Sequence, residues 1–303
     1  MNLSNQIKDR EITTIVESLQ QSAITIYREL KSGSGLDVLQ TTNTSADEQI
    51  GLDVFADECF LNNINKQTTI SYILSEERPD MVRHGLGKYS LTLDPLDGSK
   101  SAQVGIPCGA IFGLFEDVNT ISDFNGSHIV MGGFFVFGIN LEMYLAIDQK
   151  AYKGTWNSEK ANWDFIQLPA LPDGKMIAIN ASNKNKWASW LQNLYDDLVN
   201  NEDKDGKSYN MRWYASMVAE IKRLIIQGGI FIYPGDRREG YANGHLRLIY
   251  EAIPMAYLVH SLGGLSSNGD QSILDVKVSE AHQKTPVFLG NKDLIKRIES
   301  IRK

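Results

Sequence analysis

Three apolar segments follow one another in the chain at residues 108–115, 128–138 and 141–147, and glycines interrupt the first two. Apolar runs of this length, bounded by polar and turn-forming residues, are typical of neighbouring strands in an antiparallel sheet. The sequence therefore predicts a largely antiparallel sheet in the first half of the chain.

The segments before these strands follow a helical pattern and then a strand pattern. Apolar residues recur at three- and four-residue spacing over residues 12–30, which predicts an amphipathic helix with one buried stripe. A second helix is expected from about Asp53, and two further strands are expected at residues 68–74 and 89–93.

The second half of the chain alternates between strand and helix patterns, which are expected at residues 177–179, 214–227, 230–233 and 246–262. Such alternation indicates an α/β layer. The polar stretch at residues 150–164 predicts a surface connection between the halves. We therefore expect an α+β domain of residues 1–168 and an α/β domain of residues 169–303.

Composition and charge exclude several classes of function. The formal net charge is −7 and no long block of Lys or Arg occurs, which argues against a nucleic-acid partner. No stretch approaches the roughly 18 consecutive apolar residues of a membrane span, and the N-terminus lacks the apolar core of a secretory signal. We expect a cytoplasmic protein without a membrane partner, in which Cys59 and Cys108 are buried free thiols.

Four acidic residues follow directly on two of the predicted strands. Glu76 and Glu77 come after the strand at residues 68–74, and Asp94 and Asp97 lie in the Asp-Pro-Leu-Asp-Gly turn after residues 89–93. Carboxylate oxygens are the ligands that Mg²⁺ and Mn²⁺ prefer, and a phosphatase site with several metal ions needs several of them. The pattern predicts metal-assisted hydrolysis of a phosphate ester, although any one of these acids alone could be a solvated surface charge.

Two other kinds of hydrolytic site are disfavoured. The five histidines are scattered, and no Cys or His pair has the spacing of zinc ligands. A Gly-x-Ser-x-Gly sequence, which would indicate a serine nucleophile, does not occur.

Five segments along the chain resemble, in the same order, the class I fructose-1,6-bisphosphatases of the inositol-phosphatase-like superfamily. They read GKYSLTLDPLDGSK, GAIFG, RWYASMVAE, GGIFIYP and LRLIYEAIPMAYLVHSLGG. The segment GYANGHLR is similar to a bacterial branch of that family. The resemblance implies a layered α-β-α-β-α sandwich, a homotetramer, and hydrolysis of fructose 1,6-bisphosphate to fructose 6-phosphate and phosphate in gluconeogenesis or a sugar-phosphate cycle.

The resemblance also implies roles for individual acidic residues and the metal. It implies about two to three Mg²⁺ ions per subunit, with Mn²⁺ as the alternative ion. The implied ligands are Glu76, Asp94, Asp97, Glu251, the Leu96 carbonyl and the loop acid Asp47. It further implies that Asp53 and Glu77 polarise the attacking water.

Substrate contacts are implied in the same way. Gly98 and Ser99 would hold the 1-phosphate, and Asn180, Tyr233 and Arg212 would hold the second phosphate, with Arg212 reaching in from a neighbouring subunit. Trp213 stands where a tyrosine is common and His245 where a Lys or Arg is common, which changes the polar groups available there. The resemblance implies that Arg247 binds phosphate, whereas its four-residue spacing from Glu251 on one helix would by itself favour a surface ion pair.

Three alternatives stay open at this point. The sugar could be sedoheptulose 1,7-bisphosphate, alone or together with the six-carbon bisphosphate. The protein could be an inositol-monophosphatase-like enzyme, or a non-catalytic protein that binds sugar phosphates on the same scaffold.

Overall fold

The computed structural model describes residues 3–33, 38–42, 48–201 and 206–302. Its helices are α1 (Arg10–Ser32), α2 (Gly51–Ile64), α3 (Ser99–Gln103), α4 (Ser189–Asn200), α5 (Met217–Gln227), α6 (Ile253–Ser261) and α7 (Lys292–Arg302). A π-helical turn (Leu248–Ala252) leads directly into α6. In the part of the chain that is described, no helix combines the length and apolar character needed to cross a membrane.

A sheet of eight strands forms the first half of the molecule, in the order β10-β9-β8-β7-β6-β5-β3-β4. Its strands are β3 (Ile70–Ser75), β4 (Val82–Arg83), β5 (Tyr89–Asp97), β6 (Cys108–Glu116), β7 (Ile129–Phe137), β8 (Leu141–Ile147), β9 (Lys150–Asn157) and β10 (Asn162–Gln167). Only β3 and β5 pair in parallel; the other neighbours are antiparallel. The predicted antiparallel sheet is confirmed, since the three apolar segments are β6, β7 and β8.

A second sheet has five strands in the order β12-β11-β13-β15-β14. They are β11 (Met176–Ala178), β12 (Asn210–Arg212), β13 (Ile230–Tyr233), β14 (Leu265–Ser267) and β15 (Val287–Gly290). The first three strands in this order are parallel, and β15 runs antiparallel to both of its neighbours. A short pair of strands, β1 (Val38–Thr42) and β2 (Glu48–Ile50), precedes α2.

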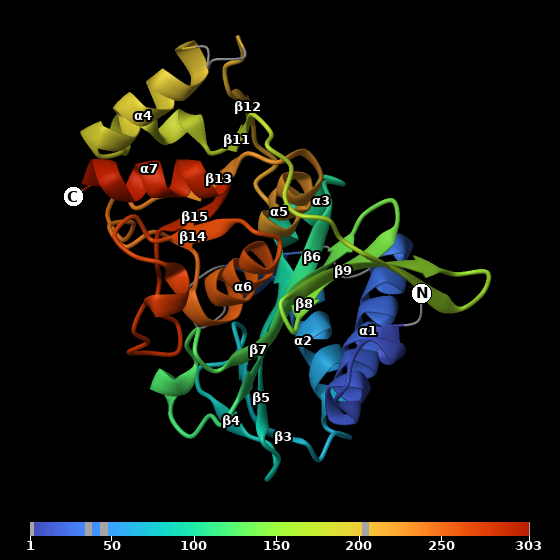
Figure 1. Cartoon of the computed structure of the whole chain (residues 1–303). Helices are drawn as coiled ribbons and strands as arrows, with labels where there is room; N and C mark the ends of the chain where they lie inside the picture. The colour runs from blue at the N-terminus through green and yellow to red at the C-terminus, as the bar shows by residue number, and fades with distance from the viewer. Residues whose placement is uncertain (1–2, 34–37, 43–47, 202–205, 303) are drawn as a thin grey trace.

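Helices and sheets alternate in five layers (Figure 1). Helices α1 and α2 cover one face of the large sheet, α5 and α6 fill the space between the two sheets, and α4 and α7 cover the outer face of the small sheet. Strand β11 shows why the small sheet has two apolar faces. Ile177 packs with the α4 and α7 layer, whereas Met176 and Ala178 pack with the α5 and α6 layer. The predicted α-β-α-β-α sandwich is confirmed.

Residues 150–164 do not form the predicted surface connection. They belong to the β9–β10 hairpin, which extends the large sheet. Ala151 and Tyr152 are buried, and the Cβ of any larger residue at Gly154 would collide with the Phe165 ring, so one side of a polar segment packs on the sheet. Lys150, Lys160 and Asn162 are exposed, and such polar residues conceal the strand pattern.

Two predicted boundaries also differ. Helix α5 begins at Met217 rather than at residue 214, because the Ser216 hydroxyl accepts a hydrogen bond from the backbone N–H of Ala219 and caps the helix. Strand β5 continues through Pro95 to Asp97, with a shift of register between Asp94 and Asp97 rather than a turn that ends the strand. Both cysteines are free thiols, as predicted, but Cys59 is only half-buried.

Candidate active site

The acidic residues meet where the parallel strands β3 and β5 end at the same edge of the large sheet. The backbone N–H of Glu76 donates to the Leu93 carbonyl at 3.0 Å, which holds the end of β3 against β5. Oxygen atoms of Asp94, Asp97 and Glu251 all lie within 4.8 Å of one another. Acids from two distant parts of the chain therefore converge on one point.

Burial and mutual repulsion dominate the electrostatics of this acidic centre. The pKa of Asp94 is raised well above its ordinary value, first by burial and then by the carboxylates of Glu76, Asp97, Glu251 and Glu77. Burial also raises the pKa of Asp97, although hydrogen bonds from Val218 and Ser216 oppose the shift. Such a centre favours the binding of positive charge.

The irregular end of β5 determines how the side chains and backbone groups of residues 94–98 are oriented in the site. The Asp94 carboxylate accepts a hydrogen bond of 3.1 Å from the Leu96 backbone N–H and so closes the bulge around Pro95. Gly98 has a φ of +77°, and a Cβ placed there would lie 3.0 Å from the Ser216 Cβ. A glycine is therefore required at residue 98, where the end of β5 lies against the loop that precedes α5.

Glu251 enters the acidic centre from the π-helical turn. Its Oε2 accepts a hydrogen bond of 2.5 Å from the Arg247 backbone N–H, while the Ala252 N–H donates to the Arg247 carbonyl at 2.9 Å. Arg247 is 2% exposed and Glu251 is 6% exposed, so the surface ion pair considered from their spacing is wrong. The Arg247 Nη1 donates to the His245 carbonyl at 2.7 Å.

A cavity of about 370 Å³ opens beside the acidic centre. Fourteen of the sixteen residues proposed from the sequence line it: Asp53, Glu76, Glu77, Asp94, Leu96, Asp97, Gly98, Ser99, Asn180, Trp213, Tyr233, His245, Arg247 and Glu251. Asp47 lies outside the described residues. Arg212 is exposed on β12, where its Nη1 donates to Asn210 and to the Met211 carbonyl, and it does not line the cavity.

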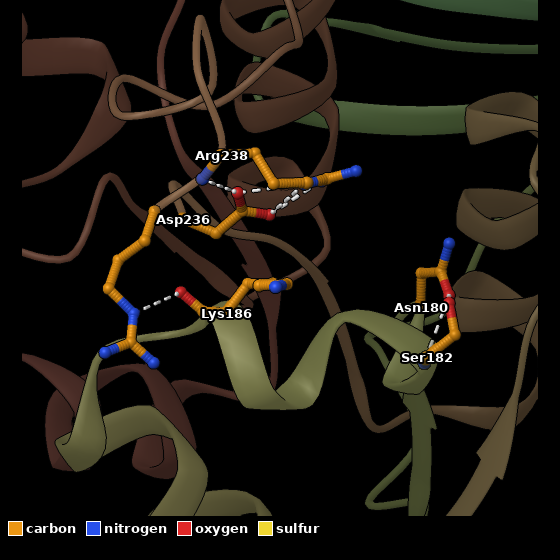
Figure 2. Close-up of polar contacts among 6 residues, drawn as sticks. Asn180, Ser182, Lys186, Asp236 and Arg238 are labelled. Carbon is orange, nitrogen blue, oxygen red and sulfur yellow. Dashed lines mark hydrogen bonds and ion pairs between the residues drawn. The ribbon is translucent and has the colours of Figure 1, made fainter.

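One wall of the cavity is aromatic. The rings of Trp213 and Tyr233 are 6.1 Å apart, and those of Tyr233 and His245 are 6.2 Å apart. Asn180 completes this wall, with its Oδ1 accepting hydrogen bonds of 3.3 and 2.5 Å from the backbone N–H and hydroxyl of Ser182 (Figure 2). Burial raises the pKa of Tyr233, so its hydroxyl stays protonated.

Sequence reasoning missed several residues that shape this site. Ser216 donates its hydroxyl to Asp97 at 3.1 Å, and Ala215 beside it has a φ of +61°, which turns the chain towards the cavity. Asp57 accepts hydrogen bonds from the Ser75 hydroxyl at 2.7 Å and from Arg78 Nε at 2.8 Å, which fixes the end of β3. A serine directly before an apolar helical run was the signal for the first of these.

The donor set at the acidic centre fits a divalent cation. The convergent atoms are carboxylate oxygens, and hard divalent ions such as Mg²⁺ and Mn²⁺ prefer oxygen ligands. Because buried carboxylates so close together repel one another, a bound cation relieves an energetic cost that the fold otherwise carries. The site can therefore hold a metal and place it beside a phosphate ester in the cavity.

Comparison with known proteins gives consistent matches over the whole length. The model of the fructose-1,6-bisphosphatase N-terminal domain matches residues 1–167, and that of the C-terminal domain matches residues 171–303. A class 1 fructose-1,6-bisphosphatase of Rhodobacter capsulatus is 38% identical over 82% of this chain and 77% of its own. One of Bradyrhizobium sp. is 33% identical over 99% of this chain and 87% of its own.

Solved structures agree with this. The crystal structure of Leishmania major fructose-1,6-bisphosphatase in holo form has a TM-score of 0.90 and 25% identity, covering 99% of this chain and 97% of that one. The apo form has a TM-score of 0.85 and covers 98% of this chain and 95% of that one. With two family models, similar relatives and a shared fold in agreement, the chain belongs to the class 1 fructose-1,6-bisphosphatase family.

Proposed function

We propose that this protein hydrolyses the 1-phosphate of fructose 1,6-bisphosphate and releases fructose 6-phosphate and phosphate. The observation that carries the proposal is a single cavity that is lined both by the convergent carboxylates of Asp94, Asp97 and Glu251 and by a polar, aromatic wall. The relatives that match the chain carry the name fructose-1,6-bisphosphatase. The carboxylates suit a phosphate ester beside a metal, and the aromatic wall suits a sugar with a second phosphate.

The metal is the first functional component. We assign about two to three Mg²⁺ ions, or Mn²⁺ as the alternative, to Glu76, Asp94, Asp97, Glu251 and the Leu96 carbonyl, with Asp47 as a further ligand. When bound, these ions would supply electrostatic stabilisation of the charge that develops during phosphoryl transfer.

The chain itself provides the proton acceptors. Asp53, in the first turn of α2, is 5% exposed and lines the same cavity as Glu77. We assign this pair to take the proton from the attacking water, since a carboxylate within hydrogen-bond reach of the water can act as a general base. Gly98 and Ser99 orient the 1-phosphate, and the planar guanidinium of Arg247 suits the ester oxygens.

The aromatic wall orients the rest of the substrate. Trp213 and His245 offer flat surfaces and N–H groups, and Asn180 offers an amide. Tyr233 can donate its hydroxyl to a phosphate oxygen, since a tyrosine hydroxyl keeps its proton near neutral pH and burial raises the pKa of this one further. We assign the sugar and its second phosphate to this wall, and we further propose a cytoplasmic homotetramer that acts in gluconeogenesis or a sugar-phosphate cycle.

The test is phosphate release from a panel of substrates with Mg²⁺, with Mn²⁺ and after removal of metal by a chelator. We expect metal-dependent release from fructose 1,6-bisphosphate and little from inositol 1-phosphate. A preference of more than about tenfold for sedoheptulose 1,7-bisphosphate would assign the enzyme to the seven-carbon sugar instead. Absence of release from every substrate would support a protein that only binds sugar phosphates.

A further inference from the structure

Two adjacent arginines in the loop after β13 make different contacts. Arg237 donates its Nε to the Lys186 carbonyl at 3.3 Å and its Nη2 to the Asn185 carbonyl at 2.6 Å. Arg238 instead forms a forked contact with Asp236, in which Nε and Nη2 lie 2.9 and 2.6 Å from the two carboxylate oxygens. The loop thus fixes one guanidinium against the backbone and the other against a buried carboxylate.

Arg238 is held rigidly from a second direction. Its guanidinium lies 3.9 Å from the centre of the Tyr241 ring, and Tyr241 stacks on His245 with ring centres 5.2 Å apart and an interplanar angle of 14°. His245 in turn lines the active-site cavity. A guanidinium that is fixed in advance loses little conformational entropy when a ligand binds.

The position of Arg238 is beside the aromatic wall. A small cavity of about 10 Å³ has Arg238 in its lining together with Asn180, Trp213 and Tyr233, and these last three residues also line the main cavity. In Figure 2 the free end of the Arg238 guanidinium points away from Asp236, towards the side on which Asn180 lies. Its side chain is 33% exposed, so a ligand can reach it.

The charge of this arginine is not fully cancelled by Asp236. Guanidinium has five N–H donors, and Asp236 engages only those of Nε and one of Nη2. The carboxylate is also shared with a second cation, since Lys186 interacts electrostatically with Asp236. Net positive charge and unused donors therefore remain beside the aromatic wall, where an anion can bind.

We propose that Arg238 binds the second phosphate of the substrate from within the same subunit and so selects sugar bisphosphates over monophosphate esters. This assignment rests on the proposed function of the cavity. It differs from the implied role of Arg212, which lies exposed on β12 and does not line this chain's own cavity. Asp236 and Tyr241 are positioning residues for the guanidinium.

The experiment compares the unmodified protein with Arg238→Gln, Arg238→Lys and the matched control Arg237→Gln. The ratio of kcat/KM for fructose 1,6-bisphosphate to that for fructose 1-phosphate is measured for each. Binding of fructose 6-phosphate, which carries only the second phosphate, is measured by calorimetry. We expect Arg238→Gln to lower the kinetic ratio and to weaken fructose 6-phosphate binding, each about 10- to 100-fold. Arg238→Lys should recover part of both losses, and Arg237→Gln should change neither by more than about twofold.

Three outcomes would overturn the assignment. If the kinetic ratio and the fructose 6-phosphate affinity are the same in Arg238→Gln and Arg237→Gln, Arg238 does not contact the phosphate. Equal losses with both esters would indicate a structural role only. If the unmodified protein hydrolyses no bisphosphate, the proposed function fails, and calorimetry with fructose 6-phosphate then decides the role of Arg238 independently: unchanged affinity in Arg238→Gln rejects it.

Discussion

The Asp97 carboxylate accepts a hydrogen bond of 3.0 Å from the backbone N–H of Val218, in the first turn of α5. This contact joins the acidic centre on the large sheet to the helix that lies between the two sheets. A helix N-terminus favours a negative charge, so α5 partly stabilises the Asp97 carboxylate in its ionised form. The position of this ligand therefore depends on the middle helical layer as well as on its own strand.

Asp97→Asn should lower metal-dependent phosphate release by about 100-fold or more, because it removes a charged ligand and keeps the side-chain shape. The variant should also lose most of the rise in Tm that Mg²⁺ gives the unmodified protein, since ligand binding to the native state stabilises it. Phosphate assays and thermal unfolding with and without Mg²⁺ check this. Asp164→Asn, on the exposed side of β10, is the control. Activity within a few-fold of the unmodified protein would reject the metal assignment.

Glu142→Gln should destabilise the fold by about 1 to 3 kcal/mol. The buried Glu142 carboxylate lies 2.7 Å from Lys153 Nζ on β9 and 2.5 Å from Lys222 Nζ on α5, and the change leaves both amines without their counter-ion. Urea unfolding measures the loss. Glu159→Gln, in the exposed turn of the β9–β10 hairpin, should leave the midpoint unchanged. Equal midpoints for the two variants would mean that this ion-pair cluster contributes no stability.

His260 should make the protein less stable at acidic pH. Burial lowers its pKa below the ordinary value of 6.5, so the unfolded chain binds a proton more readily than the folded protein does. The stabilising contribution of neutral His260 is present above pH 6.5 and is lost as the pH falls from there towards the lower folded pKa. In the His260→Gln variant, the free energy of unfolding should decrease less between about pH 7 and about pH 5.5 than it does in the unmodified protein. Urea unfolding at several pH values measures this difference. Parallel curves for the two proteins would contradict this.

Arg212→Ala should raise KM for the bisphosphate with little change in kcat, if the exposed guanidinium on β12 reaches the site of a neighbouring subunit. Kinetics and light scattering on the same samples check both parts of this prediction. A rise in KM in a protein that is monomeric at assay concentration would exclude the role across subunits. A fall in kcat alone would exclude a role in phosphate binding.

Strong periodicity made much of the fold predictable. Helix α1 and strands β6 to β8 follow directly from patterns of apolar residues, and the acids at the ends of β3 and β5 follow from residue type and position. The β9–β10 hairpin was not predictable in this way, because polar residues such as Lys150, Lys160 and Asn162 are exposed and only a few positions such as Tyr152 are buried.

Arg238 shows a second limit of the sequence. The segment Asp236-Arg237-Arg238 has the composition of a solvated loop. Nothing in the local sequence shows that its two arginines have different surroundings. Tertiary contacts determine the orientation of each side chain. The buried Asp236 binds the guanidinium of Arg238, and the backbone carbonyls of residues 185 and 186 bind that of Arg237. A pair of identical neighbours thus acquires different surroundings only in the folded chain.

The π-helical turn at Leu248–Ala252 has one consequence for how the chain can vary. A π-turn accommodates one residue more than an α-helical turn, and each residue of an α-helix corresponds to a rotation of about 100°. Deleting a single residue here would allow a regular helix but would rotate Arg247 and Glu251 relative to the apolar face of α6. In this segment the spacing along the chain is therefore as constrained as the identity of the side chains, and an indel would be more damaging than many substitutions.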